Sequence, residues 1–325
     1  MPGRSGVRCR RSRVGRCAVS SVDLSVDLAG LALRNPVLTA SGTFGYGLEL
    51  APFLDLRRIG GFVGKSLTLE PRFGNPPPRI SEVSSGMLNS ISLENVGVEA
   101  FIAEKLPRLP EDVPVIASVF GTEIEQYAAV CARLTGVPRV SGLEVNASCP
   151  HVKSGGIEFG QDPAVLARLV RAARGATSLP LLVKLSPNVT SIAEMARVCE
   201  AEGADGISLI NAVQALDIDI EKRRPVLWNG LGGLSGPAIQ PIALRMVWQC
   251  ARAVRIPVCG IGGISRAEDV VKFLLAGATA VQVGTANYLN PSVSGEIVDG
   301  LRAWCDAHGV SRVSELVGAL ETRGD

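Results

Sequence analysis

Short apolar runs alternate with longer amphipathic segments along most of the chain, from residue 36 onward. The runs are nearly continuous in Val, Ile, Leu and Ala, which is typical of strands buried on both faces of a parallel sheet. Eight of them follow one another, at residues 36–42, 61–68, 115–121, 143–149, 181–187, 206–212, 258–264 and 280–286. Eight such strands separated by helical segments predict an α/β fold, a (β/α)8 barrel with inserted loops over its C-terminal face. The alternative is a doubly wound sheet, but the Gly-rich turn that usually follows its first strand is missing.

Helix-start signals mark several of the segments between these runs. Residues 122–125, 191–194 and 265–268 each fit a capping box, in which Ser or Thr is followed three residues later by Glu. Asp162 before Pro163 fits an N-cap with proline at the first helical position. The sequence therefore predicts that helices begin near these four places.

Two stretches break the regular spacing, at residues 69–97 and 213–236. The first is too rich in Pro, Gly and Asn for a helix. Long irregular insertions in a compact domain are usually lids or binding loops. Because both follow predicted strands, we expect both at the C-terminal face, where barrel enzymes carry out their chemistry.

Every predicted strand ends in a polar side chain or in glycine. The residues at these ends are Ala40, Ser41, Gly42, Lys65, Ser66, Asn146, Ser148, Cys149, Lys184, Asn211, Gly262, Gly263, Gly284 and Thr285. Loops after the seventh and eighth strands form the usual phosphate site of such barrels, and glycine lets the backbone approach phosphate oxygens closely. We therefore predict a phosphate site at the last two strand ends, with ordinary tight turns as the alternative.

Two lysines lie on predicted barrel strands, Lys65 on the second and Lys184 on the fifth. A lysine there is rarely structural, because a buried ammonium is costly without a partner. Either lysine could form a Schiff base, as in a flavin-free barrel lyase, or hold the negative charge that develops on a reduced flavin. Two lysines beside a phosphate site, without a pair of acids at the strand ends, favour a bound flavin over a Schiff-base lysine.

Cys149 ends the fourth predicted strand, in the stretch LEVNASCPHVKSGG. A thiol at that face can act as a base or a nucleophile, and a packed cysteine is the alternative. His151 shares a face with Cys149 if the stretch is extended, although a solvated loop histidine fits as well. We predict that Cys149 is catalytic.

The charge of the chain is concentrated at its start. Residues 1–20 hold six Arg and no acid, and without them 27 of the 33 basic residues remain against 31 acidic residues. This remainder is mildly acidic, so nucleic-acid binding is not expected. We expect residues 1–20 to be a basic, disordered extension or the product of too early a start codon, with an organellar transit peptide as the alternative. Residues 21–325 are expected to form the catalytic domain.

The cysteines and the hydropathy limit which metal sites and which cellular compartment are expected for the protein. None of the eight cysteines forms a C-x-x-C pair, so no zinc or iron–sulfur site is predicted, and no metal is expected. No apolar stretch reaches the ~18 residues that a membrane span needs. A reducing cytoplasm suits this use of cysteine.

Several stretches, taken in order, resemble one enzyme family, the dihydroorotate dehydrogenases, and within it the class 1B catalytic subunit that carries FMN. The resemblance runs from about residue 22 to the C-terminus. It rests on NPVLTASGTFGYG, GKSLTLEPRFGNPPPRI, SSGMLNSISLENVG, VNASCPHVKSGGIEFGQDP, VKLSPNVT, GGLSGPAIQPIAL, GIGGI and VGTA.

The resemblance implies FMN-dependent oxidation of dihydroorotate to orotate in de novo pyrimidine biosynthesis, with one FMN per chain over the barrel mouth. Cys149 would take the C5 proton while hydride leaves C6 for flavin N5. The FMN would contact Ala40, Ser41, Gly42, Lys65, Ser66, Asn146, Lys184, Ile210, Gly236, Gly262, Gly263, Gly284 and Thr285. The substrate would contact Lys65, Asn89, Ser90, Ile91, Ser92, Leu93, Asn146, His151, Asn211 and Ala212.

The resemblance also implies partners. Class 1B enzymes are similar in passing electrons to a second subunit that carries FAD and a [2Fe–2S] cluster, and from there to NAD⁺. This sequence has neither a dinucleotide fingerprint nor a cluster motif, so both groups are expected on the partner. The expected assembly is a homodimer of barrels docked with two partner subunits, a heterotetramer in the cytoplasm.

Four positions depart from the family pattern. His151 stands where Asn is usual, Ala212 where Thr or Ser is usual, Ser92 where Gly is usual, and Glu94 where Gln is common. All four belong to the expected substrate side, whereas the flavin positions are intact. An FMN oxidoreductase acting on another dihydropyrimidine or cyclic amide is therefore the alternative, since SCPH and PNVT also resemble the flavin domain of dihydropyrimidine dehydrogenases. A non-catalytic subunit is a further alternative, but the retained Cys149 argues against it.

Overall fold

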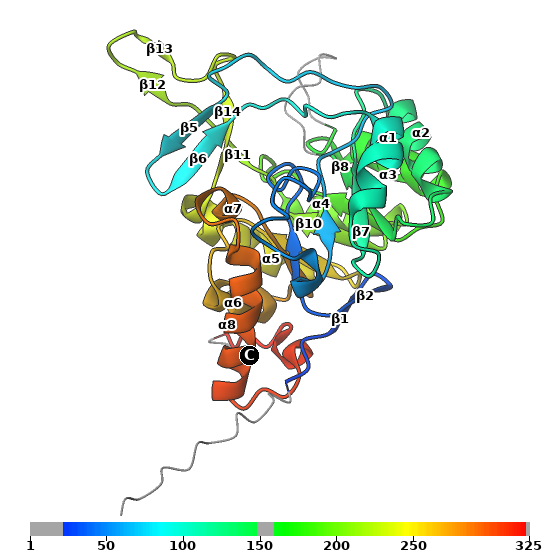
Figure 1. Ribbon diagram of the computed structural model, residues 1–325, viewed down its shortest axis with the longest axis vertical. Helices are drawn as coiled ribbons and strands as arrows, with labels where there is room; N and C mark the ends of the chain where they lie inside the picture. The colour runs from blue at the N-terminus through cyan, green and yellow to red at the C-terminus, as the bar shows by residue number, and fades with distance from the viewer. Residues whose placement is uncertain (1–21, 148–158, 323–325) are drawn as a thin grey trace, which may run out of the picture.

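The computed structural model describes residues 22–147 and 159–322 of the chain (Figure 1). The predicted residues Cys149 and His151, and the basic head at 1–20, lie outside the described residues. Eight parallel strands form one sheet in the order β3-β16-β15-β10-β9-β8-β7-β4. A parallel bridge between Leu38 and Gly61 brings the two edge strands together, so the sheet is nearly closed. The predicted barrel is confirmed, and each of the eight apolar runs supplies one strand.

The barrel strands are short and completely buried. They are β3 (Val37–Thr39), β4 (Phe62–Val63), β7 (Val115–Val119), β8 (Gly142–Asn146), β9 (Leu181–Lys184), β10 (Gly206–Leu209), β15 (Val258–Ile261) and β16 (Ala280–Val283). Every residue of these strands is buried, because their outer faces pack against helices and their inner faces fill the barrel. This two-sided burial is the physical reason for the continuous apolar runs.

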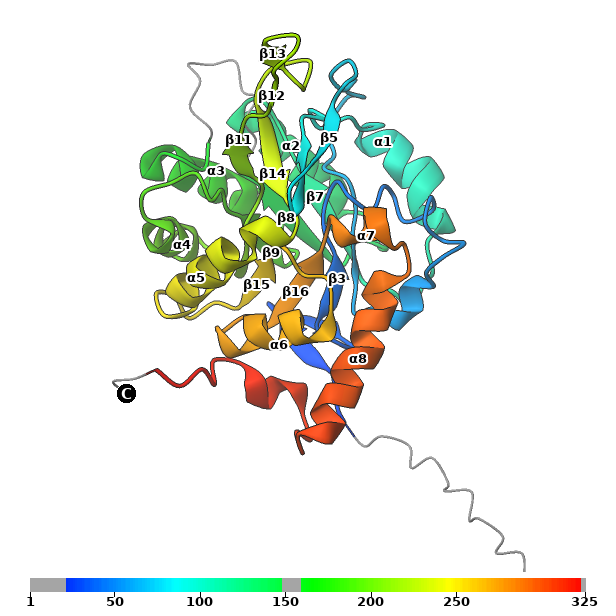
Figure 2. The same cartoon turned by 90° about the vertical axis from the view of Figure 1, so that its left-hand side faces the viewer.

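Helices surround the barrel, as Figure 2 shows for α3 to α6 and α8 around β3, β15 and β16. The helices are α1 (Val98–Ala100), α2 (Ile124–Thr135), α3 (Pro163–Gly175), α4 (Ile192–Ala201), α5 (Gln240–Ala251), α6 (Ala267–Leu275), α7 (Ala286–Leu289) and α8 (Val293–Ala307). A π-helical turn, η2 (Phe101–Lys105), continues α1, and 3-10 turns lie at η1 (Leu56–Arg58), η3 (Leu106–Arg108), η4 (Pro237–Ile239) and η5 (Val313–Leu316). Within residues 22–147 and 159–322, no helix combines the length and apolarity that a membrane crossing requires.

All four predicted helix starts are confirmed, because α2, α3, α4 and α6 begin at Ile124, Pro163, Ile192 and Ala267. The Asp162 side chain accepts hydrogen bonds from the first-turn N–H groups of α3, and the Ser191 side chain accepts one from Glu194 at the start of α4. The capping boxes expected at 122–125 and 265–268 are wrong. At α2, the Gln126 side chain instead accepts from the Thr122 N–H at 2.8 Å.

At α6 the carboxylate that accepts the hydrogen bond from Ser265 is one residue further along the chain than expected. Ser265 donates from its backbone N–H to Asp269, at 3.1 Å, rather than pairing with Glu268. Asp269 is 3% exposed, so it lies on the buried side of the helix, where it can reach back to Ser265. Burial, which the capping-box pattern does not contain, decides which acid is used.

The two insertions meet above the barrel and pair with each other. A four-stranded antiparallel sheet has the order β11-β14-β6-β5, which joins β5 (Ile80–Val83) and β6 (Gly86–Asn89) to β11 (Val213–Ala215) and β14 (Gly232–Ser235). We call it the lid sheet. A separate ribbon of β12 (Ile218–Asp219) and β13 (Arg224–Pro225) extends beyond it at the top of Figure 1. The insertions are thus more regular than their composition indicates.

The opposite end of the barrel is covered by the N-terminal hairpin of β1 (Val26–Leu28) and β2 (Leu31–Leu33). Leu28 is fully buried and Leu31 is 6% exposed. An added Cβ at Gly142 would lie 3.2 Å from Leu31, and one at Gly206 3.4 Å from Ala29, so the hairpin packs against the N-terminal ends of the strands. With this end filled, the site lies at the other end.

Candidate active site

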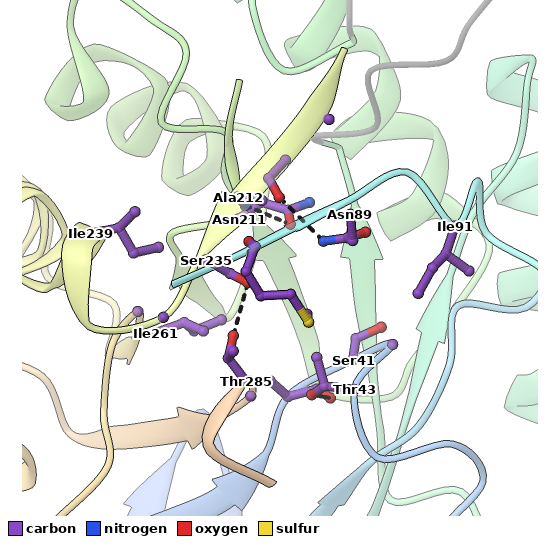
Figure 3. Close-up of a pocket in the computed structure, with 18 of the residues that line it drawn as sticks. Ser41, Thr43, Asn89, Ile91, Asn211, Ala212, Ser235, Ile239, Ile261 and Thr285 are labelled. Carbon is purple, nitrogen blue, oxygen red and sulfur yellow. Dashed lines mark hydrogen bonds between the residues drawn. The ribbon is translucent and has the colours of Figure 1, made fainter. Parts of the chain in front are cut away.

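A cavity of about 400 Å³ lies between the C-terminal strand ends and the lid sheet (Figure 3). That volume is in the range of small-molecule and cofactor sites, ~300–1,000 Å³. Every predicted site residue that the structure describes lines it: Ala40, Ser41, Gly42, Lys65, Ser66, Asn89, Ser90, Ile91, Ser92, Leu93, Asn146, Lys184, Ile210, Asn211, Ala212, Gly236, Gly262, Gly263, Gly284 and Thr285. Residues that lie up to 245 positions apart in the sequence are therefore brought to one cavity, while their roles stay predictions.

Glycine backbone forms one wall of the cavity. Gly262 and Gly263, after β15, have φ of 132° and 71°, and Gly236, before η4, has φ of 99°. A Cβ at Gly263 would lie 2.9 Å from the Gly236 carbonyl oxygen, and one at Gly262 2.8 Å from the Ala243 Cβ. These contacts are closer than real Cβ atoms show, so only glycine keeps the segments at this separation. We call Gly236, Gly262 and Gly263 the glycine cradle.

The cradle is suited to an anionic group. The start of α5 adjoins it, because Gln240 packs against Gly263 and donates from Nε2 to the Gly263 carbonyl at 3.0 Å. Free N–H groups at a helix start and in a glycine turn form the usual phosphate site of such barrels. Across the cavity Thr285 donates to Ser235 at 2.8 Å, and Figure 3 shows the two side chains pointing toward each other.

Hydroxyl and amide side chains form the floor. Ser66 contacts Ser118 at 2.8 Å and Ser41 at 3.3 Å, and it accepts from Asn146 Nδ2 at 3.2 Å. The Tyr127 hydroxyl donates to the Asn146 carbonyl at 2.8 Å, which fixes the end of β8. This chain of bonds orients the Asn146 amide, which is 5% exposed, at the bottom of the cavity.

The two lysines have different surroundings. Lys65 is half-buried at the cavity edge, with its backbone N–H bonded to the Gly45 carbonyl at 3.1 Å. Lys184 is 4% exposed, and its Nζ lies 3.9 Å from a carboxylate oxygen of Glu144, which is fully buried. One lysine can therefore meet a charged group that enters from solvent, and the other is a buried cation at the floor.

The segment from Asn89 to Asn95 is held in an unusual conformation. Ser92 and Leu93 have φ of 66° and 57°, in the left-handed region that non-glycine residues rarely adopt. Arg72 donates to the Ser92 carbonyl at 3.1 Å, and Asn95 donates to the Leu93 carbonyl at 2.9 Å. Such conformations persist only where the surroundings over-determine them, and they gather at ligand sites.

Buried polar atoms without protein partners also lie along the cavity. Within residues 22–147 and 159–322, the Ser90 hydroxyl and the Asn229 side-chain oxygen are buried and accept or donate no hydrogen bond. An unpaired buried polar group is costly, so these two atoms are suited to a bound polar molecule. The described residues contain no group of three or more His, Cys, Asp or Glu that could hold a metal ion.

Sequence reasoning missed several lining or supporting residues. Met87, Asn229 and Ser235 come from the lid sheet region, and their approach depends on pairing between segments far apart in the chain. Ser118 and Glu144 lie inside apolar runs that were assigned to the core as a whole. A polar residue within such a run is a detectable signal, because it must face a partner inside the barrel.

The fold and the cavity together define a (β/α)8 barrel with a small-molecule site at the C-terminal ends of its strands. The family model for dihydroorotate dehydrogenase matches residues 23–304. The chain belongs to the dihydroorotate dehydrogenase family, and the resemblance stated from its motifs is confirmed.

Its relatives share a common description. The chain is similar to "Dihydroorotate dehydrogenase B (NAD(+)), catalytic subunit" of Pelobacter propionicus, with 59% identity over 300 residues, which cover 92% of this chain and 99% of that protein. The protein so described from Trichlorobacter lovleyi is 56% identical over 299 residues, 92% of this chain and 98% of that protein. A crystal structure of DHODH from Eimeria tenella in complex with ferulenol has a TM-score of 0.76 at 22% identity, over 91% of this chain and 88% of that one, which supports the fold.

Proposed function

We propose that this protein is the catalytic subunit of an NAD⁺-linked dihydroorotate dehydrogenase and oxidises (S)-dihydroorotate to orotate in de novo pyrimidine biosynthesis. The observation that carries the proposal is the cavity, which combines a glycine cradle, a buried lysine and a set of amide side chains at one barrel mouth. The relatives at 59% and 56% identity carry the name of this activity.

The residues of the cavity fit FMN. The glycine cradle would receive the phosphate, and a side chain at Gly262 or Gly263 would push apart the segments that form the cradle. Lys184, at the floor, would lie beside the edge of the ring where negative charge gathers on reduction. The barrel from residue 21 to 325 is thus proposed as the FMN-binding catalytic domain. When bound, FMN supplies the acceptor for the hydride of the substrate.

The protein's own residues would bind and orient the substrate. Lys65 suits a carboxylate as a point charge. Asn89, Asn146 and Asn211 each offer an amide donor and an acceptor, which suits the imide edges of the ring. Asn89 donates to the Gly233 carbonyl at 3.3 Å, and Figure 3 shows Asn89 and Asn211 among the side chains that line the cavity. Cys149 is proposed as the base that removes the C5 proton, a step worth ~10²–10⁴-fold in rate when the base is well placed.

The electrons would leave through a second subunit. The description "catalytic subunit" of the relatives supports a partner, and "NAD(+)" in the same description supports the final acceptor. We propose that the partner carries FAD and a [2Fe–2S] cluster, and that a homodimer of this chain binds two partner subunits in the cytoplasm. Co-purification of both chains in equal amounts, with flavin and iron in the partner, tests this part.

A related cyclic amide is the second candidate substrate. Ala212 and Ser92 both line the cavity, so the substrate side lacks one hydroxyl and gains another relative to the family pattern. The test is anaerobic mixing of the purified yellow protein with dihydroorotate or with dihydrouracil. Bleaching of the visible flavin band by dihydroorotate, with one equivalent of orotate formed, supports the proposal. Bleaching by dihydrouracil alone would transfer the activity to the second candidate.

A further inference from the structure

A fully buried carboxylate lies inside the barrel, beneath the cavity floor. Glu144 is on β8, two residues before Asn146, so both side chains point to the barrel interior. The Ser208 hydroxyl on β10 donates to Glu144 Oε2 at 2.8 Å, and the Gln282 amide on β16 donates to the same oxygen at 2.6 Å. These bonds hold one oxygen of the carboxylate in place. Nothing in the proposed function uses it.

The other carboxylate oxygen points to Lys184. Glu144 Oε1 accepts no hydrogen bond from a described residue, and Lys184 Nζ lies 3.9 Å from it. That gap is longer than a hydrogen bond, so the pair is an ionic contact in which the ammonium keeps its N–H groups for the cavity. Among residues 22–147 and 159–322, Lys184 is the one basic side chain that forms an ion pair with Glu144.

The surroundings favour a charged pair. A buried charge of either sign requires a partner of the opposite sign, and Glu144 and Lys184 lie within ion-pair distance of each other. Cys259 on β15 is a further titratable group that interacts with both members of the pair. Burial raises the pKa of the Cys259 thiol, and the charge of Glu144 raises it further, so this neighbour stays neutral and adds no competing charge. Glu144 and Lys184 are therefore each other's counter-charge.

We propose that Glu144 is a positioning residue for Lys184: held by Ser208 and Gln282, it keeps the Lys184 ammonium directed at the cavity floor. The inference rests on the proposed function, since it gives the buried ammonium its place beside FMN. Lys184 can stabilise negative charge there only while its ammonium stays at that position. Glu144 would secure that position without touching cofactor or substrate.

The isosteric change Glu144→Gln can shift the reduction potential of the flavin in either of two directions. Removing a negative charge near the flavin would by itself raise the flavin's reduction potential, because the reduced ring is the more negative form. In the variant, however, an amide NH₂ can face the ammonium, and the Lys184 ammonium, without its counter-charge, is no longer held at the cavity floor. Loss of the ammonium from that position lowers the potential. The direction of the shift in reduction potential therefore distinguishes a positioning role of Glu144 from the effect of a nearby negative charge alone.

The experiment measures the midpoint potential of the flavin in the holoprotein, with dithionite and a reference dye, so no substrate is needed. We expect Glu144→Gln to make two-electron reduction less favourable by about tenfold, or ~30 mV. Lys184→Met should lower the potential as well, and adding Glu144→Gln to it should cause no further fall. Thr39→Val, which removes a buried hydroxyl of β3 that bonds the Val63 carbonyl, is the control and should leave the potential unchanged. A potential that rises or stays constant in Glu144→Gln overturns the proposal.

A second measurement applies if the Glu144→Gln variant fails to fold and cannot be purified. If Glu144→Gln does not accumulate, the double variant with Lys184→Met should accumulate, because the two charges are then removed together. Loss of the double variant as well would show that Glu144 serves the core alone, which overturns the proposal. A wild-type protein that binds no FMN would instead refute the proposed function. In that case a urea double-mutant cycle still tests the pair, and additive effects of the two changes overturn the inference.

Discussion

The glycine cradle predicts a specific loss of cofactor binding in Gly263→Ala. Gly263 has φ of 71°, and an added Cβ would lie 2.7 Å from the Gln240 Cβ and 2.9 Å from the Gly236 carbonyl oxygen. Neither atom is the end of a flexible side chain. The alanine can be accommodated only if the loop after β15 moves away from η4 and the start of α5.

The expected cost has two parts. Placing alanine in the left-handed region costs about 1–2 kcal/mol. Crowding a packed site by one methyl group costs a further ~1–3 kcal/mol, which the loop can relieve by opening the cradle. Since ~1.4 kcal/mol is a factor of ten in affinity, we expect the dissociation constant of FMN to rise at least about tenfold.

The assay is a titration of the flavin-free protein with FMN, followed by quenching of flavin fluorescence. Gly309→Ala is the matched control, because Gly309 has φ of 69° but no heavy atom within 4 Å of an added Cβ. It should lose the same ~1–2 kcal/mol of stability and keep its FMN affinity. Equal FMN affinity in Gly263→Ala and wild type would refute the assignment of the phosphate to the cradle.

Three further changes test other parts of the site. Lys65→Met should raise the dissociation constant of orotate by about 10–100-fold, since a charged hydrogen bond contributes ~1.5–3 kcal/mol, and an unchanged orotate titration of the flavin spectrum would contradict this. Arg79→Met removes the 2.7 Å ion pair with Glu94, in which the Arg79 side chain is 32% exposed and the Glu94 side chain 39%. Because the pair is partly exposed, the free energy of unfolding should fall by less than ~1 kcal/mol. KM for dihydroorotate should rise, while the FMN content stays constant. Burial raises the pKa of Asp269, but the Ser265 N–H and the Lys272 ammonium outweigh it and hold the pKa below its usual value. A carboxyl group whose pKa is lowered in the folded state stabilises the fold at pH values above its unfolded pKa of ~3.9. The difference in unfolding free energy between wild type and Asp269→Asn should therefore be full at neutral pH and shrink as the pH falls below ~4. Urea unfolding at a series of pH values measures this difference.

The barrel could be predicted because its strands are buried on both faces. That burial imposes continuous apolar runs such as VIASV in β7, which need no long-range information to detect. The strand ends could be predicted for the same reason, since each run stops at the face where polar side chains begin. Gly262 and Gly263 followed from their position after the seventh strand.

The lid sheet could not be predicted from local pattern. Its central pairing aligns Leu234 with Leu88, and the two segments lie far apart in the sequence. Composition rich in Pro, Gly and Asn indicates turns, and it does not show which segment a turn will pair with. Glu144 differs, because an acid in the apolar run LEVN shares a face with Asn146, and that signal was present in the sequence.

The proposed chemistry depends most directly on Cys149, whose role as the base is a prediction from the sequence. The decisive measurement is stopped-flow reduction of the flavin by dihydroorotate under anaerobic conditions, in wild type and in Cys149→Ala, with FMN content and orotate affinity as controls. We predict that the wild-type flavin bleaches and that the variant bleaches ~10²–10⁴-fold more slowly while both controls are kept. Equal rates in the two proteins, or a wild-type flavin that stays oxidised, would contradict the proposed oxidation of dihydroorotate with Cys149 as its base.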